Sequence, residues 1–159
     1  FNKAIQLDVR LGNAYDNRGD VYARMGSHQM AIENYDSAID LDPNDERAFG
    51  HRGASKAKIG KYSDALGDLN RAIAINPNDI NAYFERGKVR FQLKDIPAAI
   101  ADYDKVINLE PKNAQAYLER GNAYFEMGKS EDTCNDWRKA EQLGDGSAYD
   151  NIQQHCGEN

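Results

Sequence analysis

Features that mark several common protein classes are scarce or missing in this 159-residue sequence. It has only two cysteines, too few for a disulfide-rich scaffold and the wrong number for a structural zinc site. No apolar run approaches the roughly 18 residues that a membrane-spanning helix needs. The net charge of -6 provides no excess of basic side chains, which nucleic acids and anionic lipids require. We therefore expect neither membrane insertion nor a nucleic-acid partner.

Groups that carry out catalysis or hold metals are also sparse. The histidines, His28, His51 and His155, share no predicted helix face with a second ligand. The sequence contains no glycine-rich phosphate loop, nucleophile elbow or paired-histidine motif. We predict no catalytic residue, no cofactor and no metal site, and hence a protein that is not an enzyme.

What the sequence does contain is a repeat, with landmark residues spaced 34 positions apart. Each unit holds two stretches with the apolar spacing of an amphipathic helix. The landmarks are Gly19, Gly53, Gly87 and Gly121; Pro43, Pro77 and Pro111; and Ala14, Ala48, Ala82 and Ala116. The expected first helices are 13–25, 47–59, 81–93 and 115–127, and the expected second helices are 29–41, 63–75, 97–109 and 131–143.

Residues between these stretches have the chemistry of helix ends. Glycine suits a left-handed C-terminal cap, aspartate and asparagine suit an N-cap, and proline suits the first helical turn. The expected C-terminal caps are Gly26, Gly60 and Gly128, the expected N-caps are Asp45, Asp79 and Asn113, and Pro97 is expected in a first turn.

The repeat resembles the tetratricopeptide repeat family, in particular bacterial-type arrays with a cysteine-containing C-terminal cap. If units are counted from Gly12, Glu46, Ile80 and Ala114, the family's aromatic position 4 holds Tyr15, Phe49, Tyr83 and Tyr117. The glycines hold position 8 and the prolines position 32. The resemblance implies an all-α fold, a right-handed superhelical solenoid of antiparallel helix pairs.

The same resemblance divides the chain into a half-repeat, four full repeats and a cap. Residues 1–11 are expected to be the second helix of a truncated repeat, so that further repeats precede this sequence in the native protein. The expected repeats are 12–45, 46–79, 80–113 and 114–145. Residues 146–159 are expected to form a capping helix and tail, because terminal repeats need a polar outer face.

Two features of the repeat call for a packing explanation. The glycine at position 8 costs helix propensity, so we expect it to face the small residue at position 20, with Thr133 opposite Gly121 setting the fourth pair wider. Position 7 holds arginine where the family has leucine. Position 23 holds Asp68, Asp102 and Asp136, with Asn34 in the first unit, and we expect the arginines to pair with these acids, as Arg86 with Asp102. If such pairs are exposed, replacing Arg86 by leucine should leave stability intact or raise it, whereas a large loss would indicate a buried network.

In this family the first helices line a concave face, which here carries large apolar side chains beside charges. Such patches are typical of protein-binding surfaces, although these aromatic residues can also pack against their own neighbours. The predicted groove residues are Arg47, Lys58, Phe84, Lys88, Phe91, Leu118, Asn122 and Phe125. Arg47 and Lys58 are expected to bind acidic groups. A complete clamp for a peptide carboxylate is not expected, because Asp16 and Asp20 stand where its first two cationic or amide groups belong.

These residues predict a non-enzymatic scaffold for protein–protein interaction. Its partner is expected to be a protein or peptide, bound as an extended peptide or a helix in the concave groove. The alternative is a structural module that self-associates through the ends or faces of the solenoid, including the truncated N-terminal end.

The two cysteines fall in the fourth unit and the cap. Cys134 is at position 21, which should face the capping helix that carries Cys156. The ending resembles that of some exported bacterial tetratricopeptide proteins, which implies a disulfide between the two. Two buried thiols remain the alternative. The compartment stays open between cytoplasmic and periplasmic or exported, and a Cys134–Cys156 disulfide favours export.

Overall fold

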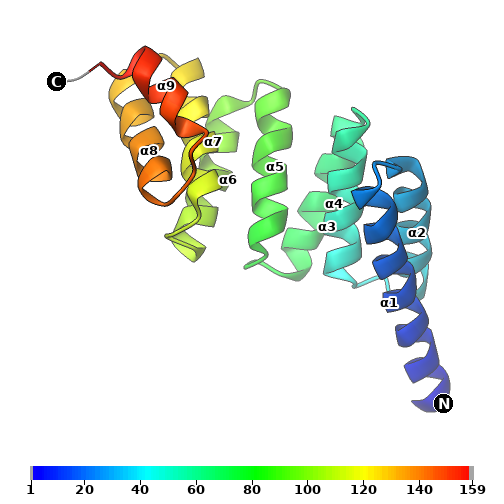
Figure 1. Cartoon of the computed structure of the whole chain (residues 1–159). Helices are drawn as coiled ribbons and strands as arrows, with labels where there is room; N and C mark the ends of the chain where they lie inside the picture. The colour runs from blue at the N-terminus through cyan, green and yellow to red at the C-terminus, as the bar shows by residue number, and fades with distance from the viewer. Residues whose placement is uncertain (1, 158–159) are drawn as a thin grey trace. The chain divides into compact units, whose positions relative to one another are not determined.

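A computed structural model describes residues 2–157 of the chain, with side chains from residue 11 onward. Those residues form nine α-helices and no strand (Figure 1). The predicted all-α repeat fold is therefore confirmed. The chain divides into two compact units, Phe1–Glu85 and Arg86–Asn159, and the division falls inside the fifth helix.

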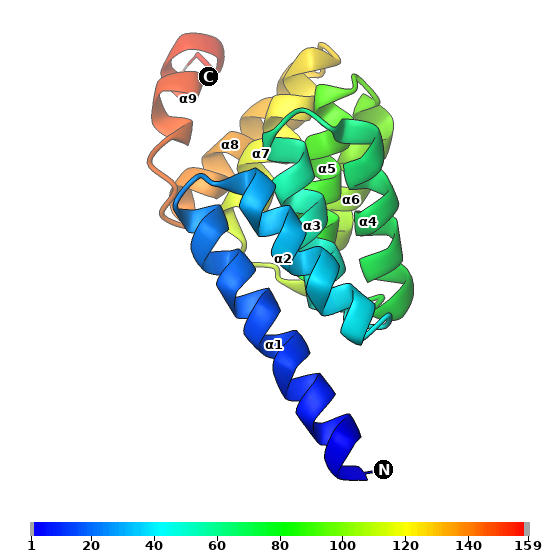
Figure 2. The same cartoon turned by 90° about the vertical axis from the view of Figure 1, so that its right-hand side faces the viewer.

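The first unit is built from helices that pack on their sequence neighbours. α1 packs against α2, α2 against α3 and α3 against α4 (Figure 2). Fully buried alanines and the rings or branched chains of Tyr35 and Leu69 form its core. The helices are α1 (Asn2–Arg24), α2 (His28–Leu41), α3 (Glu46–Lys58), α4 (Tyr62–Ile75) and the first part of α5 (Ile80–Gln92).

The second unit continues the pattern and ends on a short helix. α6 packs against α7, α7 against α8 and α8 against α9. Tyr103 and Trp137 fill the core at the same repeat position as Tyr35 and Leu69. Besides the rest of α5, the helices are α6 (Ile96–Leu109), α7 (Ala114–Glu126), α8 (Ser130–Gln142) and α9 (Ala148–His155).

The helix ends follow the predicted chemistry. Gly26, Gly60 and Gly128 have φ values of 76°, 77° and 70°, the left-handed conformation of a C-terminal cap. The side chains of Asp45, Asp79 and Asn113 each accept a hydrogen bond from the backbone N–H three residues later. In the third repeat Lys94 takes the left-handed conformation without a glycine, at φ 62°.

The glycines at position 8 lie where two helices approach, and the nearest group there is the side chain at position 24. A Cβ on Gly121 would lie 2.6 Å from Cδ1 of Trp137, and one on Gly87 would lie 2.6 Å from Cε1 of Tyr103. The predicted partner at position 20 is among the three nearest atoms only in the second repeat, where a Cβ on Gly53 would lie 3.2 Å from the Ala65 carbonyl oxygen. The wider spacing expected at Thr133 stays a prediction.

The N-terminal segment differs from the prediction. We expected a second helix over 1–11, a turn, and a new helix from 13, whereas α1 runs unbroken from Asn2 to Arg24. Val9 stands where the other repeats have proline, and Leu11 stands where they have a capping side chain. With neither a residue that stops a helix nor one that caps the next, the helix continues.

None of the helices in the described part of the chain combines the length and apolar character that crossing a membrane requires.

Candidate binding surface

Paired charges connect the two helices of the second, third and fourth repeats, as the sequence predicts. Nε and Nη2 of Arg120 donate to the two carboxylate oxygens of Asp136, each at 2.7 Å. Nη1 of Arg120 reaches back to Asp104 of the preceding repeat at 2.5 Å. Arg52 repeats the arrangement with Asp68 and Asp36. The hydrogen bonds to Asp136 and Asp104 raise the pKa of Arg120 although its burial acts to lower it.

We call these arginine–aspartate pairs between the two helices of a repeat struts. The struts are partly buried, and in the second and third repeats the aspartate pairs with a second cation as well. The side chains of Asp68 and Asp102 are 8% and 3% exposed. Lys56 adds an ion pair to Asp68, and Arg90 adds one to Asp102, both at 2.8 Å. Lys56 and Arg90 are at position 11 of their repeats, where the family pattern has an aromatic residue. The basic residues at positions 7 and 11 therefore pair with the same aspartate.

We call the first helices of the repeats, α1, α3, α5 and α7, the inner helices. A second charged cluster lies on two of them, α1 and α3, in the first unit. Asp16 of α1 is 1% exposed and accepts a hydrogen bond from Nη2 of Arg47 at 2.8 Å. Nδ1 of His51 lies 3.1 Å from Asp16 Oδ1 and 3.0 Å from Asp20 Oδ1. The hydroxyl of Tyr35 donates to Asp20 at 2.9 Å. The cluster thus joins α1 to both α2 and α3.

The proton affinities within this cluster follow from its carboxylates. The hydrogen bond with Asp16 raises the pKa of His51, and Asp20 adds to the effect, while burial and Arg47 act against it. Burial raises the pKa of Tyr35, and its hydrogen bond to Asp20 raises it further, so the phenol stays protonated. The arrangement favours a protonated His51 held between two carboxylates.

Asp16, Asp20 and His51 also form the one group of potential metal ligands found among residues 11–157. Their ligand atoms lie within 4.8 Å of one another. Carboxylates and imidazole can bind divalent cations. Here Arg47 and a protonated His51 already neutralise the carboxylates, so we assign the group a structural role.

Two adjoining hollows open beside this cluster. The first, which we call the Gly50 hollow, has a volume of about 390 Å³ and a floor of small residues, Gly50, Ala54 and Ala82. Its polar lining is Glu46, Arg47, His51, Asn76, Asp79, Asn81 and Glu85. The second, the Lys58 hollow, has a volume of about 360 Å³ and is lined by Asp20, Arg24, His28, Tyr35 and Lys58 among others. Because both contact His51, Ala54 and Glu85, they form one continuous surface.

The structure places the two predicted cations of the first unit on this surface. Arg47 lines the Gly50 hollow and Lys58 lines the second one. The sequence analysis assigned both to acidic ligands, but the guanidinium of Arg47 is already paired with the buried Asp16. This reduces the positive charge that Arg47 can offer to a ligand.

The three predicted contacts on α5 lie on either side of the division between the units. Phe84 belongs to the first unit, and Lys88 and Phe91 belong to the second. All three side chains are half-buried. The ammonium of Lys94 lies 5.7 Å from the centre of the Phe91 ring, so this ring is covered in part by a cation.

The predicted contacts on α7 all face the end of the chain. Leu118 packs against the buried cluster that includes Trp137 and Ile152, so it supports the core. Asn122 accepts a hydrogen bond from the Trp137 indole at 3.0 Å. Phe125 is 46% exposed and lies 4.8 Å from the ring of His155. Of the three, Phe125 presents the most surface for a partner.

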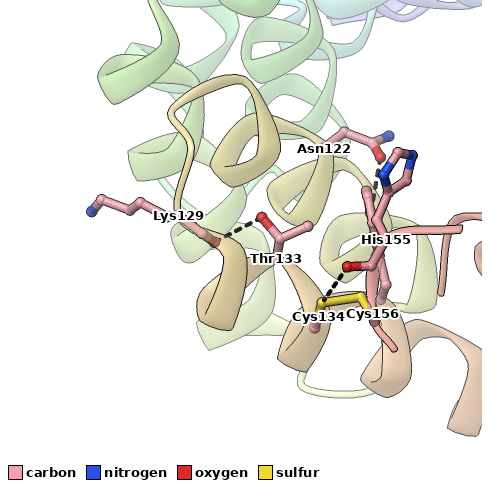
Figure 3. The surroundings of a disulfide bond; sticks show 7 residues. Asn122, Lys129, Thr133, Cys134, His155 and Cys156 are labelled. Carbon is pink, nitrogen blue, oxygen red and sulfur yellow. Dashed lines mark hydrogen bonds between the residues drawn. A yellow bond between two sulfur atoms is a disulfide. The ribbon is translucent and has the colours of Figure 1, made fainter. Parts of the chain in front are cut away.

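Cys134 and Cys156 are joined by a disulfide, which links α8 to the residue that follows α9 (Figure 3). Cys156 is 8% exposed and belongs to the same cluster as Trp137. This last helix is therefore held both by apolar packing and by a covalent bond.

Most of the inner surface of the first unit could not be predicted from the sequence. From the sequence, Asp16 was only an unfavourable charge and Asp79 only a cap. The side chains of Asp16 and His51 lie 35 residues apart in the sequence, in different repeats. The available signal was the pair of small residues Gly50 and Ala54, which lie four positions apart on one expected helix and therefore on the same side of it.

Comparison with known proteins identifies the repeat. A family model described as TPR repeat matches residues 19–60, 53–94 and 87–128. None of the curated proteins matches this sequence.

Several solved structures share the fold. A crystal structure of MamA aligns with a TM-score of 0.79 at 26% identity, covering 93% of this chain and 86% of that one. The first TPR of Spaghetti (RPAP3), bound to the HSP90 peptide SRMEEVD, aligns with a TM-score of 0.74 at 28% identity, covering 76% of this chain and 95% of that one. The first TPR domain of human RPAP3 gives a TM-score of 0.72 at 28% identity, covering 77% and 97%.

Proposed function

Because this chain belongs to the tetratricopeptide repeat family, whose domains are generally modules for protein–protein interaction, we propose that it is a non-enzymatic scaffold that binds a protein partner through its inner helices. The partner presents an extended peptide or a helix. The RPAP3 domain bound to an HSP90 peptide supports this mode of binding, since its repeats resemble those of this chain.

The observation that carries the proposal is the continuous surface made by the Gly50 and Lys58 hollows. Its small floor residues, Gly50 and Ala54, leave room for side chains of a ligand, and polar groups surround that floor. A concave surface that combines an apolar floor with a few polar groups is typical of binding sites. On the second unit, the exposed ring of Phe125 offers a further apolar contact.

Peptide display on the intact chain, followed by affinity measurements on variants, tests the proposal. Selected peptides should bind the wild-type chain and lose at least about tenfold in affinity when Gly50→Leu fills the hollow. The paired substitution Phe84→Ala with Phe91→Ala should also weaken peptides that extend onto α5.

Gly67→Leu is the matched control, since Gly67 is an exposed residue in the middle of α4 with open space around its Cα. It adds the same side chain to a helix without filling a hollow, and should leave affinity unchanged. Peptides that bind Gly50→Leu and the double phenylalanine variant as tightly as the wild type would contradict binding by the inner helices.

A second function, self-association, is favoured by one observation on α1. Leu11 is 49% exposed and, with Ala14, Tyr15 and Arg18, lines a shallow cavity of about 270 Å³. A second copy that packs there would cover these side chains. Sedimentation velocity of the wild-type chain and of Leu11→Gln tests this: a dimer that the substitution dissociates supports self-association, and a monomeric wild-type chain contradicts it.

A further inference from the structure

The Gly50 hollow carries carboxylates that have no cationic partner. No ion pair involves Glu46 or Asp79 among residues 11–157. Glu85 also lines the hollow. The hollow is therefore a concave, partly enclosed space with several negative charges at its wall.

The two cations that also line the hollow are neutralised from within. Arg47 is paired with Asp16 at 2.8 Å, and His51 lies between Asp16 and Asp20. Counting these two aspartates with Glu46 and Asp79, four carboxylates lie near two cations even when His51 is protonated. A ligand entering the Gly50 hollow therefore meets a net negative charge.

Asp79 is placed to contribute to this charge at the floor of the hollow. Its Oδ1 accepts the N-cap hydrogen bond from the Ala82 N–H at 3.1 Å. Its Oδ2 lies 3.9 Å from the position that a Cβ on Gly50 would take. One oxygen thus holds the start of α5, while the other faces the space above Gly50.

The neighbouring Lys58 hollow differs in its charges, because it is lined by two cations of its own, Arg24 and Lys58. The two hollows belong to one continuous surface, and the excess of negative charge on that surface lies at the Gly50 hollow.

We propose that the Gly50 hollow binds a lysine or arginine side chain of the partner. This rests on the proposed function and names the chemistry of the ligand at one point of the surface. The aliphatic part of such a side chain covers Gly50, Ala54 and Ala82, and its charged end lies between Glu46 and Asp79. The assignment replaces the expectation that Arg47 binds an acidic group of the ligand at this place.

Three blocked pentapeptides that differ only in their central residue provide the probes: alanine peptides with arginine, glutamine or glutamate in the middle. Their binding to the full chain is followed by NMR shifts of the backbone amides of Gly50, Ala54 and Ala82 at low ionic strength. The arginine peptide should give saturable shifts there, with an affinity at least about fivefold higher than the other two, and added salt should weaken it.

Asp79→Asn separates charge from structure. Asparagine caps a helix as well as aspartate does, and Asn113 occupies the equivalent position before α7. The variant should keep its fold and lose about fivefold in affinity for the arginine peptide. Asp45→Asn makes the same change at the cap of α3, outside the hollow, and should bind the arginine peptide like the wild type.

The outcomes separate this inference from the proposed function. Equal shifts by the arginine and glutamine peptides would overturn the basic preference and leave peptide binding standing. Tighter binding of the glutamate peptide, or unchanged affinity in Asp79→Asn, would also overturn it. If none of the three peptides shifts these amides, the assignment of a basic ligand is wrong, and the display experiment with Gly50→Leu decides peptide binding separately.

Discussion

The first and fourth repeats place their charges differently, although both follow the same 34-residue pattern. In the fourth, Arg120 connects its two helices through Asp136, whose side chain is 7% exposed. In the first, Arg18 meets the neutral amide of Asn34 at 2.5 Å. The buried carboxylate of the first repeat is instead that of Asp16, on the inner helix α1. It pairs with Arg47 and His51 of the second repeat.

This difference shows that a buried carboxylate can occupy more than one position of the repeat, provided that a cation pairs with it. Leaving a buried charge unpaired is what costs stability. Where the charge lies between the helices of one repeat, it acts as a strut. Where it lies on the inner face, as Asp16 does, it also determines the charge that a ligand meets.

The largest expected effect comes from removing a strut whose acid is buried. Arg120→Leu leaves Asp136 without its bidentate partner and should lower the free energy of unfolding by about 3–4 kcal/mol. Arg18→Leu removes a hydrogen bond to a neutral amide and should cost about 1 kcal/mol. Urea unfolding of both variants measures the difference.

Arg86→Leu should lie between these two, because Arg90 still pairs with Asp102 at 2.8 Å. This revises the expectation from sequence that the substitution is neutral, since Asp102 proves to be buried. Equal losses of unfolding free energy in Arg120→Leu, Arg86→Leu and Arg18→Leu would show that the loss does not depend on whether the arginine's partner is a buried acid.

The disulfide should have the next largest effect, restricted to the second unit. Replacing Cys134 and Cys156 together by alanine should lower stability by about 3 kcal/mol on the chain-entropy model. Hydrogen exchange should rise in α9 and stay unchanged in α1 to α3. Two free thiols titrated in the unreduced, denatured wild-type protein would contradict the disulfide.

A smaller loss is expected where a glycine faces a ring. Gly121→Ala places a Cβ 2.6 Å from the Trp137 ring and should cost about 2 kcal/mol, since the buried indole has little room to shift. Gly67→Ala, at an open site in α4, should gain about 0.5–1 kcal/mol from helix propensity. Thermal unfolding of the pair compares them, and a gain in both would show that the helices can separate at Gly121.

The smallest effect expected is a pH dependence of the first unit. The pKa of His51 is raised above its usual value of 6.5 in the folded chain, so folding favours the protonated imidazole. This contribution is fully present below about pH 6.5 and is lost as the pH rises through the folded pKa. His51→Gln should flatten the stability profile in that range. Stability that rises with pH above 6.5 through His51 would contradict the assignment.

The sequence by itself determined the helical repeat, most of its helix ends and the pairing of Arg52, Arg86 and Arg120 with acids. These depend on local chemistry and on a period that recurs in every unit. It also predicted a close approach at each glycine, but not that the side chain at position 24 is what lies there, because the orientation of that side chain depends on how two helices pack.

Only the tertiary structure decided the character of the inner surface. Whether Arg47 is available to a ligand depends on Asp16, which lies 31 residues earlier and reaches it through the packing of α1 against α3. In the same way, the oxygen of Asp79 that faces Gly50 reaches the hollow only because the start of α5 lies beside α3. Spacing along the chain reports periodic and local chemistry, whereas the charge inside a hollow depends on which helices surround it.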